Sequence, residues 1–290
     1  MRTLGYYPGC SLQGTANEYD RSLRAVAARL ETELREIPDW VCCGATSAHA
    51  IDHEAALCLA ADTLAKASRA GLHEVLAPCA MCFQRLAVAA HEIREHPGLA
   101  AKLATAFGES TDLGLDQVKP MSLLGWLGNG TADALKTQVT RPLAGLKVAC
   151  YYGCLLVRPP KITGAARPEA PQDMEQIVTL LGGQPVRWSM ATECCGASFA
   201  LSQKTTVLRQ GQRVYDAAKK SGAQILCLAC PMCHANLDMR QSEMGIAKPD
   251  QLPVVYLTQL IGWAMGLDEA ALGLNSHFVP PTSALAKGTS

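Results

Sequence analysis

Residues 41–45 of the chain are Val-Cys-Cys-Gly-Ala, and residues 193–197 are Glu-Cys-Cys-Gly-Ala. Both cysteine pairs lie between a single upstream cysteine and a downstream C-x-x-C pair, spaced C-x31-CC-x35-C-x2-C in the first copy and C-x39-CC-x34-C-x2-C in the second. Repetition of so long a pattern indicates a duplicated structural unit. Its cysteines are Cys10, Cys42, Cys43, Cys79 and Cys82 in the first copy, and Cys154, Cys194, Cys195, Cys230 and Cys233 in the second.

Short apolar runs of strand length lead into the motif cysteines, over residues 2–7, 74–77, 146–152 and 224–229. Helices are predicted over about 52–70 and 205–220, stopped by Gly71 and Gly222. Strands that alternate with helices predict an α/β fold with mainly parallel sheets. We therefore expect two tandem repeats of one α/β unit, related by pseudo-two-fold symmetry, with domains at residues 1–142 and 143–290.

Two local features carry further structural expectations. Thr15-Ala16-Asn17-Glu18 has the form of a capping box, in which the threonine and glutamate side chains satisfy the first backbone amides of a helix. The pattern predicts a helix that starts there. From about Asn275 the residues are small and polar, which predicts a mobile or partner-ordered tail.

The charge balance and the apolar segments exclude several classes of protein. Lys and Arg number 26, as do Asp and Glu, so the chain lacks the net positive charge of a nucleic-acid binder. The N-terminal residues do not resemble a secretory signal. The most apolar segments are too short or too interrupted to span a bilayer. We expect a soluble, cytoplasmic protein without a transmembrane segment.

The 13 cysteines favour metal binding over disulfides, because their number is odd and adjacent cysteines cannot easily bridge to each other. A zinc site takes four ligands, whereas each copy here offers five. Two successive cysteines can each bind a different iron, which permits an iron-sulfur cluster more open than a cube. The remaining cysteines, Cys58, Cys150 and Cys227, lie in apolar helix or strand patterns and are predicted to pack in the core.

Other residues near the motif cysteines have predicted supporting roles. Gly44 and Gly196 follow the cysteine pairs and would allow the backbone to approach inorganic sulfide closely. His49 and His234 could donate a proton to a leaving thiolate. Arg158, in a proline-rich insertion with Lys161 and Arg167, could contact an anionic substrate, although a solvated loop charge is the alternative.

Five stretches together resemble one known family. They are Tyr6-Tyr7-Pro8-Gly9-Cys10, residues 38–49, residues 150–160, Glu193-Cys194-Cys195-Gly196-Ala197-Ser198 and Asn236-Leu237-Asp238-Met239-Arg240. They resemble the CCG-domain B subunit of heterodisulfide reductase and its bacterial relatives, over nearly the whole chain. The resemblance implies two facing non-cubane [4Fe-4S] clusters, one on the five cysteines of each copy, with a disulfide cleaved between them.

The resemblance also implies partners. They are a ferredoxin-type iron-sulfur protein like the family's C subunit, a flavoprotein like its A subunit, and a small thiol or disulfide substrate or a sulfur carrier. The chain has no G-x-G-x-x-G fingerprint, so we expect it to bind no flavin or nicotinamide itself.

Three function classes follow. The first is the catalytic subunit of a disulfide or thiol oxidoreductase complex, working in either direction on a disulfide, thiol or sulfane-sulfur substrate. The second is an electron-transfer-only CCG subunit of a respiratory or hydroxyacid-oxidising complex. The third is a zinc-stabilised interaction module. Iron and sulfide analysis separates the third from the others, and activity with a disulfide and a reduced dye separates the first two.

Overall fold

The computed structural model describes residues 2–45, 48–107, 114–128 and 130–287. Each half of the chain forms a four-stranded parallel sheet, and the two sheets have equivalent strand orders, β2-β1-β3-β4 and β6-β5-β7-β8. The strands are β1 Arg2–Tyr6, β2 Thr32–Glu36, β3 Glu74–Leu76, β4 Lys119–Met121, β5 Lys147–Tyr151, β6 Gln184–Pro185, β7 Ile225–Leu228 and β8 Val254–Tyr256. The predicted α/β fold in two tandem repeats is confirmed.

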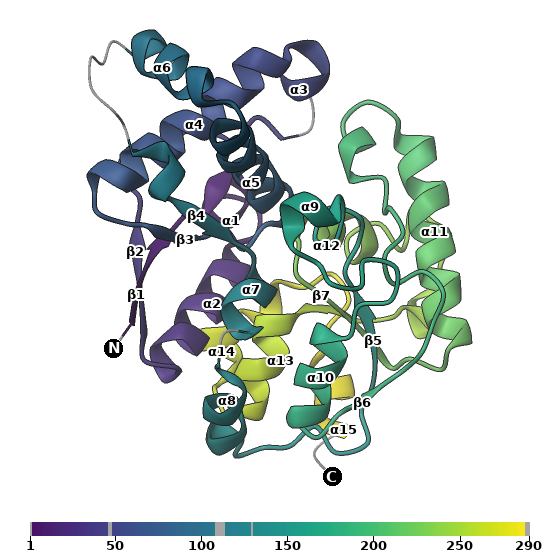
Figure 1. Ribbon diagram of the computed structural model, residues 1–290. Coiled ribbons are helices and arrows are strands. Elements are labelled where there is room, and N and C mark those ends of the chain that lie inside the picture. Colours follow the sequence, from purple (N-terminus) through teal and green to yellow (C-terminus); the bar gives the residue numbers. More distant parts are fainter. Residues whose placement is uncertain (1, 46–47, 108–113, 129, 288–290) are drawn as a thin grey trace.

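Helices cover the sheets and carry the connections between parallel strands (Figure 1). In the first repeat they are α1 Gly9–Gln13, α2 Asn17–Arg29, α3 Ala48–Ile51, α4 His53–Arg69, α5 Ala80–Glu95, α6 Pro97–Ala106, α7 Leu123–Gly128 and α8 Ala132–Gln138. In the second they are α9 Pro160–Thr163, α10 Asp173–Leu180, α11 Lys204–Lys220, α12 Pro231–Leu237, α13 Leu257–Ala264, α14 Glu269–Leu272 and α15 Thr282–Lys287. Short 3-10 turns occupy Leu115–Gln117, Ala197–Phe199, Lys248–Asp250 and Leu274–Ser276.

The two long predicted helices are confirmed as α4 and α11. Gly71 and Gly222 follow them with φ of +69° and +78°, and a Cβ at either position would meet nothing within 4 Å. Glycine is therefore required there by the left-handed backbone alone, as expected at a helix C-terminus.

The predicted capping box at Thr15 is wrong. Helix α2 begins after Ala16, and no side chain caps it. Glu18 is instead buried, with its carboxylate 3.5 Å from the hydroxyl of Tyr256 in the other repeat. A tertiary contact has replaced the local one.

The predicted mobile tail is also wrong for the described residues up to 287. The segment after Leu274 packs onto the second repeat, with Leu285 fully buried and His277 7% exposed. The carboxylate of Asp238 accepts hydrogen bonds from the backbone amides of Phe278 and Val279, at 2.8 and 3.2 Å. These contacts fix the segment, and local sequence contains no sign of them.

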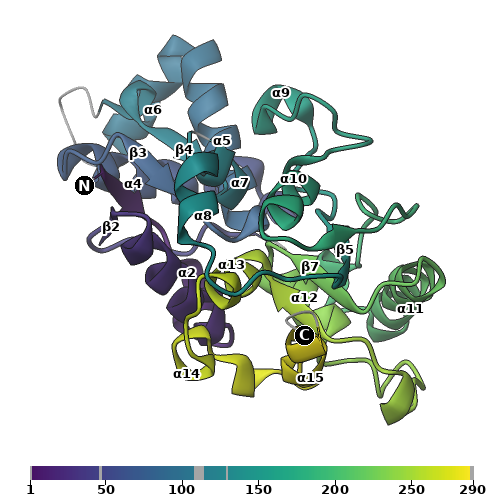
Figure 2. The same ribbon diagram turned by 90° about the horizontal axis from the view of Figure 1, so that it is seen from below.

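The two repeats pack through helix α2 of the first and helices α13 and α14 of the second (Figure 1 and Figure 2). The ring of Tyr19 stacks on that of Tyr256 with centroids 4.1 Å apart, and the hydroxyls of Ser22 and Thr258 are 2.7 Å apart. Every residue of α13 is buried. The proposed boundary at residues 142 and 143 falls in the connection between β4 and β5.

Among the described residues, no helix combines the length and the apolar character needed to cross a bilayer.

Candidate metal centres

The motif cysteines of each repeat gather at the carboxyl ends of the parallel strands. Sulfurs from distant turns meet in the same way in both repeats: the Sγ atoms of Cys43 and Cys82 are 3.4 Å apart, and so are those of Cys195 and Cys233. This edge of a parallel sheet is where α/β proteins commonly place their sites. The structure therefore brings together the thiols that the repeat predicted would act together.

The C-x-x-C pairs lie at helix N-termini. Cys79 and Cys230 are the residues immediately before helices α5 and α12, and Cys82 and Cys233 lie in the first turns. Amides that are unpaired at a helix start, together with the positive end of the helix dipole, favour thiolates. Hydrogen bonds with neighbouring thiols nevertheless raise the pKa values of Cys79, Cys82 and Cys233, and only that of Cys230 is lowered. Thiolate is the form that binds metal.

In each loop of adjacent cysteines, hydrogen bonds favour the thiolate form of one cysteine, whereas the pKa of Cys42 is raised, first by its hydrogen bond with Cys43. The pKa of Cys43 is lowered to about 3, first by hydrogen bonds from Cys42 and Cys82 and then by the amide of Ala45. The pKa of Cys194 is lowered to about 6, first by a hydrogen bond from Cys154 and then by backbone amides that follow it. The amide of Gly196 donates to the Cys194 sulfur at 3.2 Å.

Gly44 and Gly196 are required by their backbone conformation and by local packing, and their predicted close approach to inorganic sulfide stays a prediction. Their φ angles are +67° and +81°, and a Cβ on Gly44 would lie 2.8 Å from the Cβ of Ala48, while one on Gly196 would lie 3.2 Å from the Cα of Val207. The glycines thus meet the packing of the following helices, and the atoms nearest to their missing Cβ include no cysteine sulfur.

The glycines that do face sulfur are Gly9 and Gly153, which directly precede Cys10 and Cys154. Their φ angles are +63° and +64°, and an added Cβ would lie 3.0 Å from the sulfur of Cys82 and 3.4 Å from that of Cys233. Sequence reasoning did not assign these glycines a role. The sequence did contain a signal for this role, because a glycine directly precedes the first motif cysteine in both copies.

A buried tyrosine lies under each set of cysteines. The hydroxyl of Tyr7 donates to the carbonyl of Val41 at 2.8 Å, and that of Tyr151 to the carbonyl of Glu193 at 2.7 Å. Both acceptors belong to the residue just before a cysteine pair. Burial, followed by four neighbouring thiols, raises the pKa of each tyrosine, so the phenols stay protonated and keep donating.

The two sets of thiols adjoin each other. Cys79 and Cys230 occupy equivalent positions in the two repeats, and each shifts the pKa of the other: the pKa of Cys79 is raised, first by Cys230, and that of Cys230 is lowered, first by Cys233 and then by Cys79. A small cavity is lined by all five cysteines of the second set and reaches Ala80 and Met81 of the first repeat. Cys10, Cys42 and Cys194 are exposed. The sites are therefore neighbours, and each has an open side.

The cysteines outside the motif have the predicted packing role. Cys150 and Cys227 are fully buried and lie side by side in the register of β5 and β7. Cys58 is half-buried on α4 and packs against the core.

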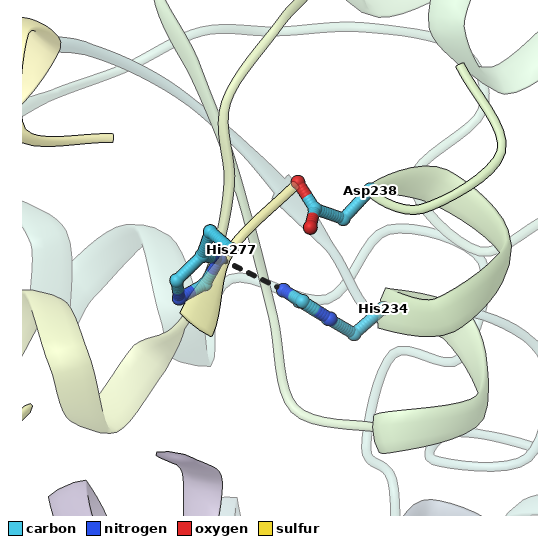
Figure 3. A group of neighbouring side chains, drawn as sticks. All are labelled: His234, Asp238 and His277. Atoms are coloured by element: carbon cyan, nitrogen blue, oxygen red, sulfur yellow. Dashed lines mark hydrogen bonds between the residues drawn. The ribbon is translucent and has the colours of Figure 1, made fainter. Parts of the chain in front are cut away.

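His49 and His234 have very different surroundings. His49 is exposed on α3, and its pKa is lowered first by partial burial and then by Arg85. His234 is 5% exposed, and its Nε2 atom lies 3.1 Å from Nδ1 of His277 and 3.2 Å from the carbonyl of Val254 (Figure 3). Burial lowers the pKa of His234 to about 3, so the ring is neutral near pH 7.

His234, Asp238 and His277 bring three metal-binding side chains within 4.8 Å of one another. Gln259 determines how His277 is protonated. Its Oε1 accepts the amide of Tyr256, so its Nε2 donates to Nε2 of His277, 2.8 Å away. The His277 proton is then on Nδ1, which faces His234, and this nitrogen has no lone pair for a metal. The three residues form a hydrogen-bond network that holds the C-terminal segment.

The Arg158 guanidinium is already occupied. Its Nε and one Nη bond the two carboxylate oxygens of Glu169 at 3.1 and 2.5 Å, and the other Nη donates to the carbonyl of Thr192 at 2.7 Å. These bonds attach the insertion to the turn before Cys194. A substrate contact by Arg158 would have to compete with them.

The residues fit iron-sulfur clusters. Each donor set consists of sulfur alone, which selects thiophilic centres. The absence of a Cβ at Gly9 and Gly153 leaves the space that the sulfurs of Cys82 and Cys233 need. Backbone amides point at the sulfurs in the second set, as they do in proteins that tune such clusters. Five thiols also exceed the four ligands of a closed zinc site.

Comparison with known proteins places the chain in a family. The family model for the cysteine-rich domain, CCG, matches residues 4–87 and again residues 148–238. The chain is 34% identical to the 8-methylmenaquinol:fumarate reductase membrane anchor subunit of Wolinella succinogenes, over 97% of this chain and 99% of that protein. It is 26% identical to the B subunit of ferredoxin:CoB-CoM heterodisulfide reductase from Methanosarcina mazei, over 99% of this chain and 97% of that protein.

A solved structure shares the fold. The crystal structure of a hypothetical protein from Helicobacter pylori superposes with a TM-score of 0.73 at 12% identity, covering 96% of this chain. This chain spans about half of that protein, 52% of its length. With two matching domains and relatives along its whole length, the chain belongs to the CCG cysteine-rich domain family and is homologous to the B subunit of heterodisulfide reductase.

Proposed function

We propose that this chain is the subunit of an oxidoreductase complex in which a disulfide, or a related thiol or sulfane-sulfur substrate, reacts between two non-cubane [4Fe-4S] clusters. Family membership and cysteine content support an iron-sulfur subunit. One observation supports the joint reaction more than any other. The cavity lined by the five cysteines of the second set is also lined by Ala80 and Met81, which directly follow Cys79 of the first set, so the two ligand sets adjoin.

Ten cysteines would hold the clusters. The first set is Cys10, Cys42, Cys43, Cys79 and Cys82, and the second is Cys154, Cys194, Cys195, Cys230 and Cys233. When bound, the clusters would supply electrons singly and iron atoms that accept sulfur. Reduction of a disulfide consumes two electrons and two protons and gives two thiols.

The protein's own groups would prepare this chemistry. The helix starts and loop amides stabilise thiolate ligands, and the open sides at Cys10, Cys42 and Cys194 leave room for a substrate. His49 is the better candidate for proton delivery, because it is exposed on α3, six residues after Cys43 in the sequence, whereas His234 is enclosed by its network. Normal turnover at all pH values in His49→Gln or His234→Gln would exclude the replaced histidine as the proton donor.

A second function is favoured by the relative from Wolinella succinogenes, which is named as a subunit of a fumarate reductase and shares 34% identity with this chain. In that case the two sites would only carry electrons within a respiratory complex, and the substrate would react on another chain. The partners we propose for the first function are a ferredoxin-type iron-sulfur protein and a flavoprotein, like the C and A subunits of heterodisulfide reductase.

The test begins with anaerobically purified protein. We expect iron and acid-labile sulfide, and electron paramagnetic resonance signals from two clusters, one of which disappears in Cys43→Ala and the other in Cys195→Ala. Protein that contains no acid-labile sulfide, or that contains zinc instead of iron, would refute the proposal. Oxidation of a reduced dye by a disulfide then supports the first function. Oxidation of a quinol analogue in the purified complex, without any disulfide activity, supports the second.

A further inference from the structure

The two ligand sets differ in charge at equivalent positions. Three residues after the last ligand cysteine of each set, helix α5 carries Arg85 and helix α12 carries Asn236. Asn236 is 1% exposed, and its Nδ2 lies 3.2 Å from the carbonyl and 3.8 Å from the sulfur of Cys195. Arg85 occupies the matching place in the first set: it is half-buried on helix α5, one turn after Cys82 and on the same face, and Cys43 acts on it electrostatically.

The positive charge of Arg85 is not neutralised by a neighbouring carboxylate, because no hydrogen bond or ion pair joins this side chain to a carboxylate within the described part of the chain. Burial lowers the pKa of Arg85, and Cys43 opposes that effect. An arginine nevertheless stays protonated at any ordinary pH. A half-buried, unneutralised cation therefore lies one helical turn from Cys82, the last cysteine of the first set.

A second difference acts in the same sense. The residue before the cysteine pair is Val41 in the first set and Glu193 in the second. Glu193 places a carboxylate directly before Cys194, although it is exposed and so partly screened. Arg158 also lies near Cys154, but Glu169 pairs with it through both oxygens and offsets its charge.

We propose that these differences between the two repeats give the two clusters different reduction potentials, with the higher potential on the cluster of the first repeat. This inference depends on the proposed iron-sulfur clusters. Adding an electron makes a cluster more negative, so a nearby cation favours the reduced form and a nearby anion opposes it. The cluster on the first repeat would therefore be reduced before the other. Arg85 and Glu193 would set the reduction potentials of the clusters without contacting the substrate.

The experiment is an anaerobic redox titration of the purified complex, followed by electron paramagnetic resonance. In the wild type we expect two signals at different midpoint potentials. Arg85→Gln should lower only the higher of the two midpoint potentials. The expected change is about tenfold in the ratio of reduced to oxidised cluster, which equals about 59 mV for one electron. Arg85→Lys keeps the charge and should leave both signals in place.

Glu193→Gln is the second variant, and its exposed position makes it a mild change for the fold. It should move only the lower signal, upward, by about twofold to threefold in the same ratio. Coincident wild-type potentials, a shift of the lower signal in Arg85→Gln, or no shift in either variant would overturn this inference and leave the clusters assigned. Absence of both signals would instead refute the proposed function.

Discussion

Replacement of Gly9 by Ala tests how closely the backbone fits the cysteine sulfurs. An alanine at a φ of +63° costs about 1–2 kcal/mol through its left-handed backbone. Its Cβ would also lie 3.0 Å from the sulfur of Cys82, which therefore has to move by a few tenths of an ångström. If Cys82 leaves its rotamer, a further ~0.5–1.5 kcal/mol is lost.

Two other glycines provide matched controls. Gly71→Ala has the same kind of backbone strain at φ +69° with nothing within 4 Å, so it isolates the strain. Gly153→Ala has equal strain at φ +64° and an ordinary contact of 3.4 Å with the sulfur of Cys233. The three variants thus differ chiefly in the approach to sulfur.

The assay is anaerobic urea unfolding together with iron analysis. Gly71→Ala should be destabilised by about 1–2 kcal/mol and keep its full iron content. Gly9→Ala should be destabilised more and lose roughly half of the iron, and Gly153→Ala should fall between the two. If Gly9→Ala and Gly71→Ala have equal stability and equal iron, the inferred sulfur contact has no consequence and the reasoning is refuted.

Three further predictions concern contacts around the sites. Tyr151→Phe removes the hydrogen bond to the carbonyl before Cys194 and should cost about 1 kcal/mol in urea unfolding, with broadened signals from the second cluster only. Burial raises the pKa of Asp238 to about 7 from 3.8, so the folded chain keeps a proton that the unfolded chain loses between about pH 4 and pH 7. Stability should fall across that window by up to roughly 4 kcal/mol, and Asp238→Asn should abolish this dependence; an unchanged pH profile in the variant would contradict it. Arg158→Ala should loosen the insertion by releasing Glu169 and raise susceptibility of residues 159–170 to proteolysis, whereas a raised KM with unchanged proteolysis would favour the substrate role.

The fold could be predicted from sequence because its signals are local and occur twice. Apolar runs lead into cysteines, Gly71 and Gly222 stop the long helices, and the C-x-x-C pairs begin helices α5 and α12. Each of these is a short-range pattern of residue types. Repetition in the second half then doubled the information about every element.

The errors came from contacts between residues far apart in sequence. Glu18 pairs with Tyr256 across 238 positions, which no capping pattern at Thr15 could indicate. His277 and Phe278 are held by His234 and Asp238, so a polar segment that looked like a free tail is fixed. The role of Gly9 depends on the position of a sulfur 73 residues later, and only coordinates supply that distance.

The attachment of the C-terminal segment to helix α12 sets an order for biosynthesis. The last cysteine of the first set is residue 82, whereas His277 lies 43 residues beyond His234, the residue beside Cys233 that it bonds. As the ribosome releases the chain from its N-terminus, the first pocket has all its ligands early. The second gains its full support only after residues 277–279 have been made, so removal of this segment should selectively impair maturation of the second centre.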